Sequence, residues 1–217
     1  MAEPTSELAI DASGVARRFG TRWVLRGVSM QVRAGEAVGL LGANGSGKST
    51  LLRIFATLLR PNAGAVQAFG KDVVRAADRV RATLGFLAHA PGLYDDLTAR
   101  ENLRFAAAML GIAGEHARIA DAALEQVGLA HAADERVRGF SAGMERRLAV
   151  ARMVLARPRL LLLDEPYSNL DAAGIAMMNE IITGIVHGGG AAVVVLHELA
   201  PAAGILNRTV TLKDGRV

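Results

Sequence analysis

A glycine-rich segment, Gly-Ala-Asn-Gly-Ser-Gly-Lys-Ser at residues 42–49, constrains the fold of this chain more than any other feature. The apolar run at residues 37–41 predicts a buried strand before it, and residues 51–56 after it carry apolar side chains at helical spacing. Strand, glycine loop and helix form the context in which Gly-x4-Gly-Lys-Ser/Thr predicts a phosphate-binding loop. A chance glycine turn is the alternative, but a chain with only three lysines seldom supplies such a match. We therefore expect a site for a nucleoside triphosphate.

The residues of this loop have separate physical roles. The glycines let the backbone turn tightly and aim successive N–H groups at an anion. The helix that opens at about Gly47 adds its positive end to the same place. Lys48 can reach the β- and γ-phosphates, and the Ser49 hydroxyl can ligate Mg²⁺. The expected nucleotide-binding residues here are Gly42, Asn44, Gly45, Ser46, Gly47, Lys48, Ser49 and Thr50.

Composition limits the class of protein. A chain of 217 residues is long enough for one domain with a full core. The formal net charge is +4, but the 22 arginines are scattered rather than gathered in a run, so no nucleic acid is expected as a partner. The absence of cysteine excludes disulfide scaffolds and thiolate metal sites. The acidic residues 1–7 do not resemble a signal peptide. No apolar run approaches the ~18–20 residues of a membrane span, so we expect a soluble protein.

The order of predicted elements indicates an α/β chain with a helical insert. Consecutive helices without intervening strands, beginning at the capping box of Thr98 and Glu101, predict an insert of about 50–60 residues. Ser141 is a natural N-cap for the helix that follows it. The expected strands are residues 8–15, 24–32, 37–41, 66–69, 84–87, 160–163 and 191–196, with a hairpin-like edge at 209–215. The expected helices follow the phosphate loop and cover residues 73–81, 99–110, 115–127, 144–156 and 171–186.

An acidic pair follows the four-leucine strand at residues 160–163. The carboxyl ends of buried parallel strands are where doubly wound sheets bind ligands. Asp164 is therefore expected to hold Mg²⁺, and Glu165 to orient or deprotonate the attacking water. His197 ends a second buried strand, which would place it near the γ-phosphate; a core or surface histidine is the alternative.

Two aromatic residues flank the turn at residues 20–22. Phe19 and Trp23 lie some 25–30 residues ahead of Lys48, where an aromatic ring could rest against adenine. Filling a small core is the equally weighted alternative for either residue alone.

Five segments, in this order, resemble an ABC transporter ATPase: residues 42–49, 141–147, 160–166 and 168–171, and His197. The resemblance covers essentially the whole chain. It implies a P-loop NTPase (RecA-like) parallel-sheet core with an N-terminal antiparallel β part and an inserted helical subdomain. Residues 1–217 would form a single domain, with 1–88 and 157–217 as catalytic core and 89–156 as the helical subdomain that ends in the signature helix. ATP and Mg²⁺ are the implied cofactors, and Glu165 and His197 the catalytic residues.

The resemblance also implies partners. A second copy would pair head to tail with the first, so that Ser141, Gly143 and Asp171 contact the nucleotide of the other protomer. Phe19 matches the adenine-stacking aromatic of the family better than Trp23 does. An integral membrane subunit would receive the work of hydrolysis. The implied location is peripheral, at the cytoplasmic face of the inner membrane.

Three positions depart from the usual family pattern. The signature reads Phe-Ser-Ala-Gly-Met at residues 140–144, so Met144 cannot make the hydrogen bonds of the usual glutamine. His89 replaces the Q-loop glutamine, which weakens the implied contact of that position with Mg²⁺. Ser-Asn-Leu-Asp at residues 168–171 replaces the commoner Ser-Ala-Leu-Asp, which we expect to be harmless.

Two of these departures resemble one group within the family. A histidine at position 89 and the Ser-Ala-Gly signature followed by Arg146 and Arg147 are similar to the haem-exporter ATPases of cytochrome c maturation, the CcmA group. Other exporters, for drugs, lipids or polysaccharides, stay open, as does a soluble ATPase of iron–sulfur assembly. The loop at residues 89–96 and the helix after Thr98 are the expected surface for coupling to the membrane subunit.

Overall fold

Five parallel strands form the sheet that positions the phosphate loop, in the order β6-β7-β8-β3-β9. The computed structural model describes residues 7–217. Every residue of β7 and β8 is buried, which explains their unbroken apolar sequence. The bounds are β3 Ala37–Leu41, β6 Leu84–Leu87, β7 Leu160–Asp164, β8 Ala191–Val195 and β9 Arg208–Thr211.

A second, antiparallel sheet covers one side of this core, in the order β2-β1-β4-β5. Its strands are β1 Leu8–Phe19, β2 Arg22–Arg33, β4 Ala63–Ala68 and β5 Lys71–Asp72. β1 and β2 extend beyond the expected 8–15 and 24–32 because their pairing continues to Phe19 and Arg22, at the turn itself.

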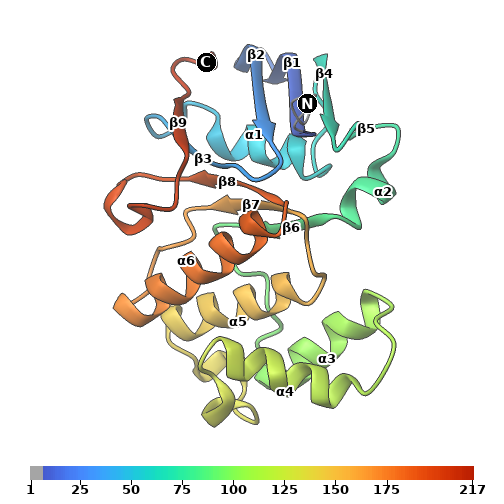
Figure 1. Cartoon of the computed structure of the whole chain (residues 1–217), viewed down its shortest axis with the longest axis vertical. Helices are drawn as coiled ribbons and strands as arrows, with labels where there is room; N and C mark the ends of the chain where they lie inside the picture. The colour runs from blue at the N-terminus through green and yellow to red at the C-terminus, as the bar shows by residue number, and fades with distance from the viewer. Residues whose placement is uncertain (1–6) are drawn as a thin grey trace, which may run out of the picture.

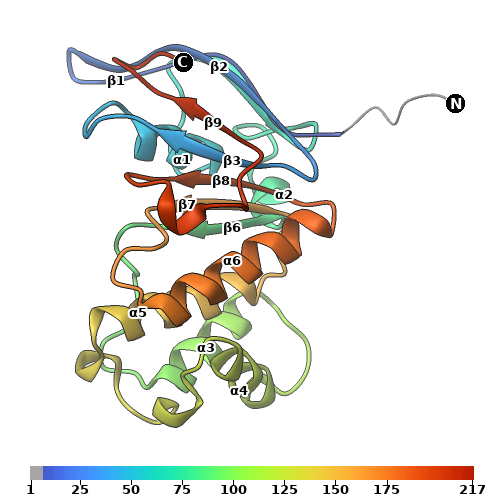
Figure 2. The same cartoon turned by 60° about the vertical axis from the view of Figure 1, so that its left-hand side comes forward.

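Helix α1, Lys48–Phe55, lies between the two sheets (Figures 1 and 2). Leu51, Leu52, Ile54 and Phe55 are fully enclosed and share one core with residues from both sheets. The phosphate loop therefore leads into a helix that is packed on both sides.

The short helix α2 (Ala77–Arg81) packs on the same side as α1, since its Val80 belongs to the core around α1. Helices α3 to α6 lie on the other face of the parallel sheet, with α5 and α6 nearer to it than α3 and α4 (Figure 2). They share a second core with that face, which includes Leu148 of α5 and Leu161 of β7. The predicted capping box of Thr98 and Glu101 is confirmed at the start of α3. The helices are α2 Ala77–Arg81, α3 Ala99–Met109, α4 His116–Gln126, α5 Ala142–Val154 and α6 Ala172–His187, with short 3₁₀ turns at Ala130–Ala132, Val137–Gly139 and Ala200–Ala202.

Two expected elements differ in the structure. The helix expected at residues 73–81 begins only at Ala77, because the Asp72 carboxylate accepts the backbone N–H groups of Val74 and Arg75 and holds a turn there. The C-terminal edge is no simple hairpin. β9 pairs in parallel with β3, and the chain then turns back between Lys213 and Arg216.

The division at residues 88 and 156 stays a prediction, since α5 packs on both the sheet and the outer helices. Among residues 7–217, no helix combines the length and apolar character that crossing a bilayer requires. The expectation about a signal peptide rests mainly on residues 1–6, which lie outside the described residues.

Candidate nucleotide site

The carboxyl ends of β3, β6, β7 and β8 meet at one edge of the parallel sheet. Leu40 pairs with Val195, and Asp164 pairs with the same Val195 from the other side. Since the phosphate loop follows β3 and Glu165 follows β7, the register brings both to one place. A cleft of about 310 Å³ there is lined by Arg22, Val24, Asn44, Gly45, Gly47, Lys48, Ser49, Thr50 and Glu165. The two regions that were expected to act on one triphosphate thus share a crevice.

Close packing explains two glycines of the phosphate loop. Gly42 has a φ of +147°, and a Cβ there would lie 2.3 Å from the carbonyl oxygen of Leu212. Gly47 has a φ of +110°, and its Cβ would lie 2.7 Å from a methyl carbon of Leu25. Any side chain at either position would force the loop away from β9 or β2.

The loop presents donors for an anion. Gly47 is the N-cap of α1 and has no side chain to bond the first amides of the helix, so these amides and the positive helix end are available to a ligand. Lys48 is buried, and its Nζ donates to the carbonyl oxygens of Gly42 at 2.7 Å and Ala43 at 3.1 Å. Both acceptors are neutral, so the ammonium carries a charge that the loop does not neutralise.

Asp164 has the chemistry of a cation ligand. It is only 4% exposed, and its Oδ1 has no hydrogen-bond partner among the described residues. An unpartnered buried carboxylate oxygen is costly, which fits a position that a bound cation satisfies. Residues 7–217 hold no cluster of three His, Cys, Asp or Glu side chains suited to a metal. A single buried carboxylate oxygen suits Mg²⁺, which takes one or two protein ligands and completes its shell with phosphate oxygens and water.

Two histidines flank the Glu165 carboxylate. His197 Nε2 lies 2.7 Å from Oε1, and His89 Nδ1 lies 3.6 Å from Oε2. Glu165 itself has a φ of +52°, a left-handed backbone conformation that is strained for a non-glycine residue. His89 was expected as a metal ligand; its recorded contact is with Glu165, and the metal role stays a prediction.

The signature segment and the 168–171 loop pack against one another. Ser141 caps α5, where its Oγ accepts the N–H of Met144 at 3.3 Å, and its side chain remains exposed. A Cβ on Gly143 would lie 2.8 Å from the carbonyl oxygen of Asn169. Asp171 caps α6 through the N–H of Gly174 at 2.9 Å and pairs with Arg147. These two interactions, the backbone one first, lower the pKa of Asp171. Their contacts with a second copy stay a prediction.

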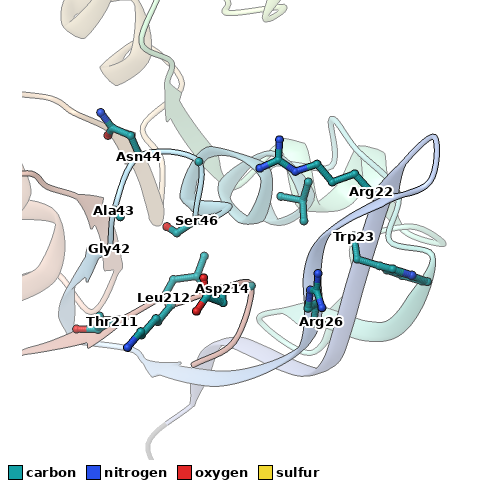
Figure 3. Close-up of a pocket in the computed structure, with 14 residues that line it drawn as sticks. Arg22, Trp23, Arg26, Gly42, Ala43, Asn44, Ser46, Thr211, Leu212 and Asp214 are labelled. Carbon is teal, nitrogen blue, oxygen red and sulfur yellow. The ribbon is translucent and has the colours of Figure 1, made fainter.

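Neither aromatic of the β1–β2 turn is a core residue. Phe19 is 49% and Trp23 42% exposed, so the core-filling alternative is wrong for both. Trp23 lines a hollow of about 540 Å³ beside the phosphate loop, bounded by β2 and residues 211–215 (Figure 3). Phe19 does not line it, and the Arg17 guanidinium lies 4.9 Å from its ring centroid. Adenine stacking on Phe19 stays a prediction.

Sequence reasoning missed the role of Arg146. This side chain is buried, and its guanidinium donates to backbone carbonyl groups of the segments that carry His89 and Glu165. Burial lowers the pKa of Arg146, while the negative charges of Asp164 and Glu165 raise it. The signal in the sequence is spacing: positions 146, 149, 150 and 153 form one helical face, and all four are buried.

A phosphate loop on an inner strand of a parallel sheet, with carboxylates at the end of the strand two places away, defines a P-loop nucleotide triphosphatase. The chain belongs to the ABC transporter family, whose model matches residues 25–168. It is therefore an ATPase of the ATP-binding-cassette type. The predicted family, fold class and ATPase activity are confirmed.

Three known proteins are similar to this chain over most of its length. It is 44% identical over 187 residues to the cytochrome c biogenesis ATP-binding export protein CcmA of Xanthomonas axonopodis pv. citri, which covers 86% of this chain and 85% of that protein. It is 36% identical over 213 residues to the daunorubicin resistance ATP-binding protein DrrA3 of Streptomyces coeruleorubidus, with 98% of this chain and 67% of that protein covered. An ATP-binding cassette solved as a dimer bound to ADP and Pi superposes with a TM-score of 0.84 at 26% identity, over 96% of each chain.

Proposed function

We propose that this ATPase binds ATP with Mg²⁺ between two copies of itself and powers a separate membrane exporter, which carries haem in cytochrome c maturation. The observation that supports hydrolysis most directly is the common cleft of Lys48, Ser49 and Glu165. The haem assignment rests on the similarity to CcmA, together with His89 and the Ser-Ala-Gly signature.

ATP binding would begin with an exchange of partners at Lys48. Its ammonium bonds two neutral carbonyl oxygens, whereas phosphate oxygens carry a negative charge that attracts the ammonium more strongly. The triphosphate therefore draws Lys48 from Gly42 and Ala43 while the amides at the start of α1 bond the same phosphates.

Hydrolysis requires a water aligned with the γ-phosphate. Ser49 and Asp164 are the proposed ligands of Mg²⁺, which when bound neutralises charge on the β- and γ-phosphate oxygens. Glu165 accepts a proton from the attacking water, and His197 holds the carboxylate in place at 2.7 Å. His89 stands at the other oxygen of the same carboxylate.

The signature segment supports pairing with a second copy. Ser141 and Asp171 are exposed, and the N-terminus of α5 carries the same positive end as the phosphate loop helix. In a head-to-tail pair, this helix end faces the γ-phosphate bound by the partner. The ATP-binding cassette described above, solved as a dimer, supports pairing of two copies.

An apolar hollow between α3, α5 and β6 is the proposed docking place for the membrane subunit. It measures about 340 Å³, and exposed Tyr94, Phe105, Met109 and Leu110 line part of it. The Tyr94 and Phe105 rings meet edge to face at 5.1 Å. Asn102 holds the backbone of Tyr94 by hydrogen bonds at 2.9 and 3.0 Å. A membrane subunit that displaces side chains in the hollow would therefore also displace residues 89–94, which include His89.

Membrane fractionation tests this docking directly. We expect the ATPase to sediment with cytoplasmic membranes when the membrane subunit is present, and Met109→Glu to release it into the supernatant. Ala108→Glu, on an exposed position of α3 outside the hollow, is the matched control. Sedimentation unaffected by Met109→Glu contradicts the docking surface. A protein that never sediments favours the iron–sulfur alternative.

Deletion of the gene tests the cargo. For a haem exporter we expect loss of covalently bound haem in c-type cytochromes, restored by the wild-type chain and not by Glu165→Gln. The similarity to DrrA3 over 98% of the chain favours drug export as the second candidate. Normal cytochromes together with new drug sensitivity would support that candidate instead.

A further inference from the structure

Arg146 is an arginine enclosed in the core between the signature segment and the catalytic strand. It lies just over one helical turn beyond Ser141 and is 4% exposed. A buried guanidinium is tolerated only when its donors find acceptors. Arg146 makes no ion pair with a carboxylate in residues 7–217, so its partners must come from the backbone.

The backbone supplies one carbonyl group for each of the five donors of a guanidinium. Nη1 donates to Ala88 at 2.7 Å and to His89 at 3.4 Å. Nη2 donates to Asp164 at 2.9 Å and to Glu165, and Nε donates to Pro166 at 3.3 Å. One side chain thus joins two loops that are 58 and 18 residues away from it in sequence.

These two loops carry the groups around the reacting water. Glu165 has the strained φ of +52°, and Arg146 holds its carbonyl group and those of the residues on both sides of it. The His89 carbonyl is held by the same guanidinium, which fixes the approach of its ring to Glu165. Lysine has one ammonium and cannot span both loops with a planar fork.

We infer that Arg146 is a positioning residue for hydrolysis. It fixes the positions of Glu165 and His89 relative to each other and to the first turn of the signature helix. The inference rests on the proposed catalytic role of Glu165.

The first experiment compares Arg146→Lys with Arg100→Lys in the full chain. Arg100 is a partly buried arginine of α3 that pairs with Asp121 and Asp134, remote from the cleft, so its replacement controls for the loss of a bonded guanidinium outside the site. We expect Arg146→Lys to lower kcat about tenfold to hundredfold, the usual cost of a small misplacement at a reacting centre, while the Kd for ATP stays within about twofold. Equal kcat for both variants, or ATP affinity lost together with kcat, would overturn the inference.

The second experiment is a double-mutant cycle with Glu165→Gln, read in single-turnover rates. A residue that acts through Glu165 causes little further loss when Glu165 is already replaced, whereas a general structural defect adds its full cost. Additive losses therefore contradict a positioning role.

Arg146→Gln, which keeps two amide donors, serves in both experiments if the lysine variant does not fold. Full turnover by Glu165→Gln alone would refute the proposed catalytic role of Glu165, while an active Arg146→Lys beside an inactive Glu165→Gln refutes only this inference.

Discussion

His197 Nε2 lies 2.7 Å from Glu165 Oε1, so the carboxylate proposed to activate water is already oriented by a side chain that follows the neighbouring strand β8. The two residues are 32 positions apart in sequence and meet because β7 and β8 are adjacent and parallel. Geometry of this kind, in which a base is held by a third group, is what general-base catalysis requires.

Replacement of Glu165 by Gln should separate binding from hydrolysis. We expect ATP to bind with near-normal affinity, kcat to fall about a hundredfold or more, and an ATP-bound dimer to accumulate on size-exclusion chromatography. Glu198→Gln, at the exposed residue next to His197, is the control and should turn over normally. Full activity of Glu165→Gln would mean that another group is the base.

Lys48→Ala should weaken ATP binding. The variant removes a charged donor that bonds phosphate oxygens, and each such bond contributes roughly 1.5–3 kcal/mol, so the Kd for ATP should rise at least about tenfold. Titration calorimetry measures this directly. Lys71→Ala, on the short edge strand β5, changes the same charge far from the loop and should leave the Kd unchanged.

Gly143→Ala should impair dimer formation more than ATP binding. Its Cβ would lie 2.8 Å from the carbonyl oxygen of Asn169, which pushes the signature turn away from the 168–171 loop. In a Glu165→Gln background, we expect the ATP-bound dimer to be lost from chromatography while monomeric ATP binding remains. Gly139→Ala, where a Cβ meets nothing within 4 Å, should retain the dimer.

Phe19→Ala should weaken ATP affinity by about tenfold, if stacking on a base contributes the usual 1–3 kcal/mol. The affinities for GTP and ATP should fall by the same factor, because stacking on a ring does not depend on the hydrogen-bonding groups of the base. Trp23→Ala is the comparison, and a larger loss in that variant would make Trp23 the adenine platform. Trp23 is also the sole tryptophan, so its fluorescence should change when nucleotide enters the neighbouring cleft.

Asp171 should contribute stability that acid removes. Bonds from the Gly174 amide and Arg147 favour the charged carboxylate and lower its pKa in the folded protein. A lowered folded-state pKa gives stability that is fully present above the unfolded value of about 3.9 and is lost as the pH falls through the folded value. Asp171→Asn should therefore unfold earlier in urea at pH 7 and show a smaller change in midpoint between pH 5 and 3. Equal acid dependence of both proteins would contradict this assignment.

Local sequence patterns were enough to predict several strands of the core and the start of several helices. The strand, loop and helix around residues 37–55, the strand at residues 84–87, and the caps at Thr98 and Ser141 depend on neighbours in sequence, and the structure confirms them. The helix expected from Val73 is wrong in its first half because one side chain, Asp72, competes for the backbone there.

Features that depend on distant contacts could not be read from the sequence. The parallel placement of β9 beside β3 needs the whole sheet, so residues 209–215 resembled a hairpin edge. The five carbonyl partners of Arg146 come from two loops that meet only after folding. Exposure of Phe19 and Trp23 likewise follows from a hairpin that extends beyond the core.

Helix α1 has the antiparallel sheet on one side and the parallel sheet on the other, so movement toward either sheet would require repacking of the core. A force on the bound triphosphate is therefore transmitted through α1 to both sheets, whose packing resists displacement of the helix. The path from the cleft to the outer helices runs through residues 88–96, which belong to no helix or strand. Side chains hold this segment instead, Arg146 at its start and Asn102 at Tyr94, so these hydrogen bonds must change if the cleft and the outer helices move relative to one another.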